Sequence, residues 1–149
     1  MSFTAWLLLQ SACTYYMTGV IWLVQLVQYP CFSNIARDQF HDFHNRHTAM
    51  MGVLVGPVML IELASALVLT LKFEKLWILN LMPLCLIWYV TFRVSVPLHH
   101  QLSLNYSESA VQSLVSTNWI RTWAWTARAG LVTWALWQTL MVAEAGKIP

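Results

Sequence analysis

The first 36 residues of the chain contain no Asp, Glu, Lys or Arg. This uncharged stretch is longer than the 20 or so mostly apolar residues that a membrane-spanning helix needs. The whole chain of 149 residues is 58% hydrophobic and 9% charged, whereas a soluble domain carries roughly 25% charged residues. The composition therefore indicates an integral membrane protein, and it excludes a soluble globular domain, a disordered chain and a disulfide scaffold.

The net charge is small, because eight Lys and Arg residues stand against six Asp and Glu residues and give +2. A nucleic-acid-binding domain would carry a clustered basic surface. We therefore expect the lipid bilayer to surround the chain and expect no nucleic-acid partner.

Three further segments have the length and apolarity of a membrane span. Strands are not expected, because the apolar runs are long and do not alternate with polar residues. The connections are short, so consecutive helices should be antiparallel neighbours. We predict an all-α integral membrane protein, an up-down bundle of four transmembrane helices that forms one domain over residues 1–149, with spans at Ala5–Gln28, His47–Leu71, Leu76–Leu98 and Asn118–Ala143.

The N-terminus is predicted to be an uncleaved first span, because it lacks a basic segment and its apolar run exceeds that of a signal peptide. Asp38 is expected near the start of the second helix, and Ser107 in a cap or short helix. A tight turn is expected at Lys72–Lys75. The turn and the termini share one side of the bundle, and the turn is rich in Lys for its length, so we expect cytoplasmic termini in a plasma (inner) membrane.

All five histidines lie on the opposite side, in the two longer connections. Three of them recur every third residue, so on a helix at ~100° per residue each is offset from the next by about 60° and shares a face with it. Imidazole is a common ligand of Zn, Cu and Fe. We predict a site for Fe, Cu or Zn, or for a haem, with ligands drawn from His41, His44, His47, His99 and His100. A pH-responsive or hydrogen-bonding function and a purely structural one remain alternatives.

Charged residues inside spans are costly and point to function. Glu62 and Arg128 lie at similar depths in two different spans, so we expect them to pair, either to fix the helix register or as part of a proton route or a polar substrate contact. Arg93 and Arg121 lie near the histidine side. We predict that these two arginines are catalytic and stabilise an anionic oxygen; binding of lipid phosphate is the alternative.

Trp119 and Trp123 crowd the start of the fourth span. An interfacial aromatic belt is the first explanation, and the second, which makes them the candidate cofactor-binding residues, is a pocket that stacks on a flat ligand. The cysteines form no CxxC motif, and Walker, GxGxxG and GxSxG motifs are absent. ATP-driven transport by this chain alone is therefore not expected.

Short motifs in the second half resemble the anthrone-oxygenase-like family of small four-span membrane proteins. They are Pro97–Leu102 and Asn118–Thr122, followed by Arg128, and Tyr29–Pro30 after the first span also fits. His99 stands where the family pattern has Asn. The resemblance implies a four-span fold and an oxygenase-like pocket at the histidine side, in a family whose named members oxidise flat polycyclic phenols with O₂.

These observations predict a membrane-embedded, oxidoreductase-like protein that acts on a lipophilic substrate, such as an aromatic one, at a histidine-lined site on one membrane face. The alternative is a non-enzymatic accessory subunit of a larger membrane complex that binds a cofactor or pigment through its histidines. A small transporter is a third hypothesis, supported only by the two charges at depth, Glu62 and Arg128.

Overall fold

The computed structural model describes residues 1–73 and 77–146, and all regular structure in these residues is helical. The predicted all-α class is therefore confirmed. In chain order the elements are α1 (Phe3–Leu23), η1 (Val24–Gln28), α2 (Tyr29–Cys31), η2 (Phe32–Asn34), α3 (Arg37–Lys72), α4 (Ile78–Val90), η4 (Thr91–Ser95), α5 (Val96–Leu104) and α6 (Glu108–Ala145).

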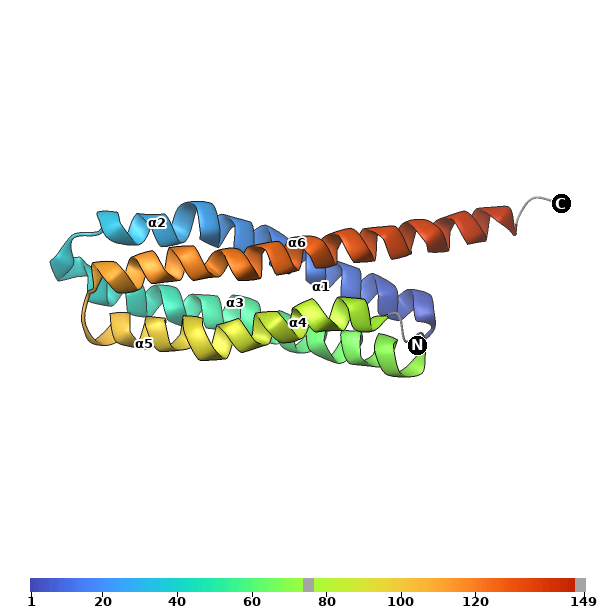
Figure 1. Ribbon diagram of the computed structural model, residues 1–149, viewed down its shortest axis with the longest axis horizontal. Coiled ribbons are helices and arrows are strands. Elements are labelled where there is room, and N and C mark those ends of the chain that lie inside the picture. The colour runs from blue at the N-terminus through green and yellow to red at the C-terminus, as the bar shows by residue number, and fades with distance from the viewer. Residues whose placement is uncertain (74–76, 147–149) are drawn as a thin grey trace.

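The elements form four long rods that run alternately up and down (Figure 1). The first rod joins α1, η1, α2 and η2, the third joins α4, η4 and α5, and α3 and α6 are rods by themselves. Helix α1 packs against α3 and α6, and α4 packs against the same two helices. Helix α6 extends beyond the other rods at its C-terminal end (Figure 1).

Three of the rods are long and apolar enough to cross a membrane, namely Phe3–Asn34, Arg37–Lys72 and Ile78–Leu104. Helix α6 is not among them, although the sequence predicted a fourth span at Asn118–Ala143. Polar residues lower the average hydropathy of α6, and several of them are buried inside the bundle, among them Asn118, Arg121 and Arg128.

The helix boundaries agree with two predictions from the sequence. Asp38 lies in the first turn of α3, so the first three histidines lie on a helix. Ser107 caps α6 by accepting a hydrogen bond from the amide of Ala110 at 3.3 Å. The helix that it caps begins well before the predicted fourth span. The predicted turn at Lys72–Lys75 lies partly outside the described residues, as does Leu76, the predicted start of the third span.

Two rods contain one π-helical segment each, and each segment is followed by a proline. The amide of Tyr29 bonds the carbonyl of Val24, and Pro30 follows. The amide of Val96 bonds the carbonyl of Thr91, and Pro97 follows. Proline has no amide hydrogen and breaks the α-helical hydrogen-bond ladder, and π-turns rotate the side chains that follow them. Both segments lie at the histidine end of the bundle.

The predicted ion pair between Glu62 and Arg128 is confirmed, with 2.5 Å between the carboxylate and the guanidinium. The same carboxylate accepts hydrogen bonds from Thr14 at 2.9 Å and from the Trp125 indole at 3.2 Å. Arg128 also donates to the side-chain oxygen of Asn80 at 3.1 Å. The pair therefore joins α1, α3, α4 and α6 in the middle of the bundle.

Candidate functional site

Two histidines from different rods meet at the histidine end of the bundle. His44 on α3 is fully buried, and its Nε2 lies 3.0 Å from Nδ1 of His99 on α5. The other nitrogen of His99, Nε2, lies 3.0 Å from the hydroxyl of Tyr29. The other nitrogen of His44, Nδ1, lies 3.3 Å from the hydroxyl of Ser103. Tyr29, His99, His44 and Ser103 therefore form one continuous hydrogen-bonded chain, which we call the Tyr–His–His–Ser chain.

The local backbone explains why these side chains meet. Tyr29 directly follows the π-turn of the first rod, and His99 follows the π-turn of the third rod by one helical turn. His44 and Ser103 come from regular helix. Aromatic rings pack around the histidines: Phe40 stacks on His44 with ring centroids 5.5 Å apart, and Phe32 meets His47 edge-on at 5.1 Å.

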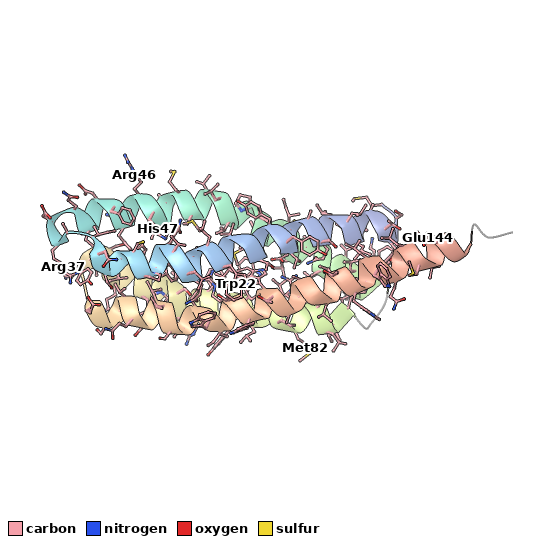
Figure 2. All side chains as sticks on the ribbon, turned by 90° about the horizontal axis from the view of Figure 1, so that it is seen from above. Trp22, Arg37, Arg46, His47, Met82 and Glu144 are labelled. Carbon is pink, nitrogen blue, oxygen red and sulfur yellow. The ribbon has the colours of Figure 1, made fainter. Side chains whose placement is uncertain are left out.

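His47 lies beside this chain, with its ring centroid 6.1 Å from that of His99. Figure 2 shows Arg46 pointing away from the bundle, whereas His47 lies between the rods. His47 and His99 both line an apolar cavity of about 550 Å³, which we call the histidine-end cavity.

Arg121 lines the same cavity and is only 8% exposed. Its Nη1 donates to Ser95 at 3.1 Å, and its guanidinium lies beside the Tyr29 hydroxyl. Its Nε has no hydrogen-bond partner among the described residues, and none of the ion pairs found there involves Arg121. A buried cation without a counter-charge is costly, so an anionic or oxygen-bearing group in this cavity would stabilise Arg121.

The walls of the histidine-end cavity are apolar. Trp88 and Phe92, whose rings stack at 5.3 Å between centroids, form part of one wall. The indole nitrogen of Trp88 is buried without a partner in the described structure. The cavity thus has a polar end at Arg121 and Tyr29 and a long apolar body, and the apolar lining also includes Met17, Val20, Ile21, Val24, Met51 and Met59.

Gly52 and Gly56 belong to the lining on the α3 side. The sequence pattern of two glycines four residues apart is typical of close helix approach. In the structure a Cβ added at either glycine would meet no atom within 4 Å. The two glycines therefore leave space along the cavity rather than admit a neighbouring backbone.

Several predicted site residues lie outside this arrangement. His41 is on the surface, where it contacts Asp42 and Asn45. His100 and Arg93 are exposed. Trp119 and Trp123 stack on each other, and both meet the Trp22 ring edge-on, at the outside of α1 and α6. Trp123 is 58% exposed, and neither Trp119 nor Trp123 is part of the cavity lining.

The predicted metal site has little support in the geometry. Within residues 1–73 and 77–146, no group of three His, Cys, Asp or Glu side chains is placed to hold a metal ion. Both ring nitrogens of His44 and both of His99 are taken up by hydrogen bonds. Binding a metal there would require these rings to give up their present partners, so the arrangement does not fit a metal centre as it stands.

Sequence reasoning missed Tyr29, Ser95 and Ser103 as parts of the site. Tyr29 had one signal, its position before Pro30 at the end of a span. The two serines had none, because single serines are common in helices. A comparison with known protein families, with curated proteins and with solved structures finds no match to this chain, so the family resemblance stays a prediction.

Proposed function

We propose that this chain is a four-span membrane protein whose histidine-end cavity binds a lipophilic substrate through an oxygen atom, in an oxidoreductase-like reaction. The observation that carries the proposal is the Arg121 side chain. It is a buried cation that lines an otherwise apolar cavity and has no ion-pair partner among the described residues.

The membrane assignment of α6 is supported by which of its faces is polar. Arg128 pairs with Glu62 inside the bundle, and Asn118 donates to Gln25 at 2.9 Å. Large apolar side chains also face outwards, and Trp134 and Trp137 are 60% and 59% exposed, although Thr133 and Gln138 are exposed as well. A helix with polar groups facing its neighbours and apolar groups facing outwards satisfies the bilayer, although its mean hydropathy is modest.

The substrate class is supported by the shape and polarity of the cavity. About 550 Å³ lies within the range of pockets that hold small organic ligands. The paired rings of Trp88 and Phe92 favour a flat ring system or a hydrocarbon chain. An oxygen at the polar end would satisfy Arg121, and it would be positioned next to Tyr29 and His99.

The reaction type is supported by the side chains at the polar end of the cavity. Arg121 stabilises negative charge on an oxygen, and Tyr29 and His99 are groups that carry protons. Oxidation or reduction of phenols and quinones needs both. The electrons would be exchanged with O₂ or with a redox group that the chain receives.

The test is calorimetric titration of an octyl-substituted phenol into the full chain in lipid nanodiscs. We expect saturable binding to the wild type and at least tenfold weaker binding to Arg121→Gln. The matched control is Arg93→Gln, which removes an exposed arginine of the same end and should leave the affinity unchanged. No binding to the wild type, or equal affinities of the two variants, would refute the proposal.

One observation favours the accessory-subunit hypothesis as a second candidate. The three indoles of Trp22, Trp119 and Trp123 form an aromatic cluster on the outer surface, and such clusters are enriched at protein interfaces. Native mass spectrometry after mild solubilisation tests it. A stoichiometric partner lost on Trp123→Ala but kept on Trp137→Ala would support a docking function, whereas a chain that migrates alone would argue against it.

A further inference from the structure

We infer that the histidine-end cavity takes a proton from its bound ligand and passes it along the Tyr–His–His–Ser chain to water beside Ser103. The inference rests on the proposed function, because it needs a ligand oxygen beside Arg121 and Tyr29. It adds a direction of proton movement and the protonation state that the ligand hydroxyl must have when it binds.

The direction follows from the hydrogen-bonding capacity of each group. Arginine has donors only, so Arg121 cannot accept the hydroxyl hydrogen of Tyr29. Tyr29 is 4% exposed, and the hydrogen-bond acceptor found beside its hydroxyl among the described residues is Nε2 of His99. A buried hydroxyl hydrogen without an acceptor is costly. Tyr29 therefore donates to His99.

This donation fixes the protonation of both rings. A neutral His99 that accepts at Nε2 carries its hydrogen on Nδ1, which faces Nε2 of His44 at 3.0 Å. His44 then accepts at Nε2 and carries its own hydrogen on Nδ1, which faces the Ser103 hydroxyl at 3.3 Å. Every donor in the chain points away from the cavity.

With all its donors pointing away from the cavity, the Tyr–His–His–Ser chain can move one proton from the cavity to Ser103. The ligand hydroxyl gives its proton to the Tyr29 oxygen, and the Tyr29 proton passes to Nε2 of His99. The Nδ1 proton of His99 passes to His44, and the Nδ1 proton of His44 passes to the Ser103 hydroxyl, which releases a proton to water. The net reaction converts the ligand hydroxyl and one water into a ligand anion and a hydronium ion. No oxidant is needed for this step.

The surroundings of the Tyr–His–His–Ser chain suit proton uptake at Tyr29 and proton release at Ser103. The ligand anion remains beside the Arg121 guanidinium, which lines the cavity and has no ion-pair partner among the described residues. Ser103 is half-buried and lies one residue from the end of α5, next to the connection to α6. Water can therefore reach the outer end, while the inner end lies in the apolar cavity.

The ligand class follows from the need for a base. A carboxylic acid, with a pKa of about 4, is already ionised at neutral pH, whereas a phenol, with a pKa of about 10, is not. A proton route has no function for a carboxylic acid that is already ionised, but it has one for a hydroxyl that still carries its proton. The proton route therefore requires a ligand hydroxyl that is still protonated at neutral pH, which a fatty acid does not have.

The first experiment measures the histidine tautomers in the wild-type chain by ¹⁵N NMR of histidine-labelled protein in nanodiscs. We expect both His44 and His99 to be neutral, with the hydrogen on Nδ1, the less common tautomer in water. A hydrogen on Nε2 of either ring, or a charged ring at neutral pH, would overturn the inference. This measurement needs no ligand and no variant at the site.

The second experiment uses an octyl-substituted nitrophenol, whose phenolate is coloured and whose neutral form is nearly colourless at the same wavelength. We expect the wild type to bind the probe as phenolate at a pH where the probe in empty nanodiscs is neutral. Arg121→Gln should lose the phenolate colour. His44→Phe should slow phenolate formation at least tenfold in stopped-flow measurements, and the matched control His41→Phe should not.

The outcomes separate the two proposals. Failure of the wild type to bind the probe overturns the proposed function, and this inference with it. Binding of the probe in its neutral form overturns the inference alone. Equal rates of phenolate formation in His44→Phe and His41→Phe would show that the proton leaves by another route, and would also overturn it.

Discussion

The Glu62 carboxylate and the Arg128 guanidinium form an ion pair in which both side chains are completely buried. Each partner is further satisfied by neutral groups, Glu62 by Thr14 and Trp125, and Arg128 by Asn80. Because the contributing residues come from four different rods, the pair can form only when the rods have the correct axial register. We therefore assign it a structural function, to fix that register.

Replacement of Glu62 by Gln should destabilise the bundle by about 3–5 kcal/mol, because it leaves the Arg128 cation buried without a counter-charge. The measurement is the free energy of unfolding in a denaturing-detergent titration, with the exposed Glu144→Gln as control. The double variant Glu62→Met with Arg128→Met should recover most of the loss. An unchanged unfolding free energy for Glu62→Gln would contradict the structural function.

Substitutions at Gly52 and Gly56 should affect the stability of the bundle and the binding of the octyl phenol in different ways. A Cβ at either position meets nothing within 4 Å, and Gly in a helix costs roughly 0.5–1 kcal/mol relative to Ala. We therefore expect Gly52→Ala and Gly56→Ala each to raise stability by about that amount. Gly56→Leu should fill the histidine-end cavity and weaken binding of the octyl phenol at least tenfold, without unfolding the chain. Full binding by Gly56→Leu would place the ligand elsewhere.

Treatment of the purified chain with a strong chelator should leave binding of the octyl phenol unchanged. The expectation follows because both ring nitrogens of His44 and of His99 are already engaged in hydrogen bonds. Elemental analysis before and after treatment accompanies the titration. Loss of binding on chelation, with recovery on adding back Fe, Cu or Zn, would restore the metal site that the sequence predicted.

Glu108 should make the histidine end sensitive to acid. The hydrogen bond from the Tyr106 hydroxyl, followed by those from Ser33 and Arg37, lowers the pKa of the Glu108 carboxyl. A group whose pKa is lower in the folded state contributes stability above its unfolded pKa, and that contribution is lost as the pH falls through the folded value. The melting temperature of the wild type should therefore exceed that of Glu108→Gln at neutral pH, and the two should converge in acid. A constant difference across this range would contradict the assignment.

Much of the fold could be predicted from the sequence. Long apolar segments that do not alternate with polar residues favour helix, and short connections favour an up-down arrangement, so the gathering of all histidines at one end followed from topology. The Glu62–Arg128 pair was also predictable, because two opposite charges at similar depth avoid the cost of a buried unpaired charge when they pair. The mean hydropathy of α6 did not confirm the predicted fourth span. Several polar residues of α6 are buried inside the bundle, and a mean over the helix counts them in the same way as polar residues on its surface.

The candidate site depended on tertiary structure. Adjacent residues on a helix point about 100° apart, so His99 and His100 cannot both face the bundle interior, and the sequence does not say which one does. His41 and His44 share a helix face, and Arg93 and Arg121 lie near the same end, yet only the structure shows that His44 and Arg121 are buried while His41 and Arg93 are exposed. Rotation of each rod about its axis is set by packing against two neighbours at once, and the π-turns before Tyr29 and His99 add a local rotation. The sequence by itself determined that the helices form and which end carries the histidines, because length and apolarity are local properties. Only the packed bundle decided that Tyr29, His44, His99 and Arg121 meet, because side-chain direction depends on the contacts of all four rods.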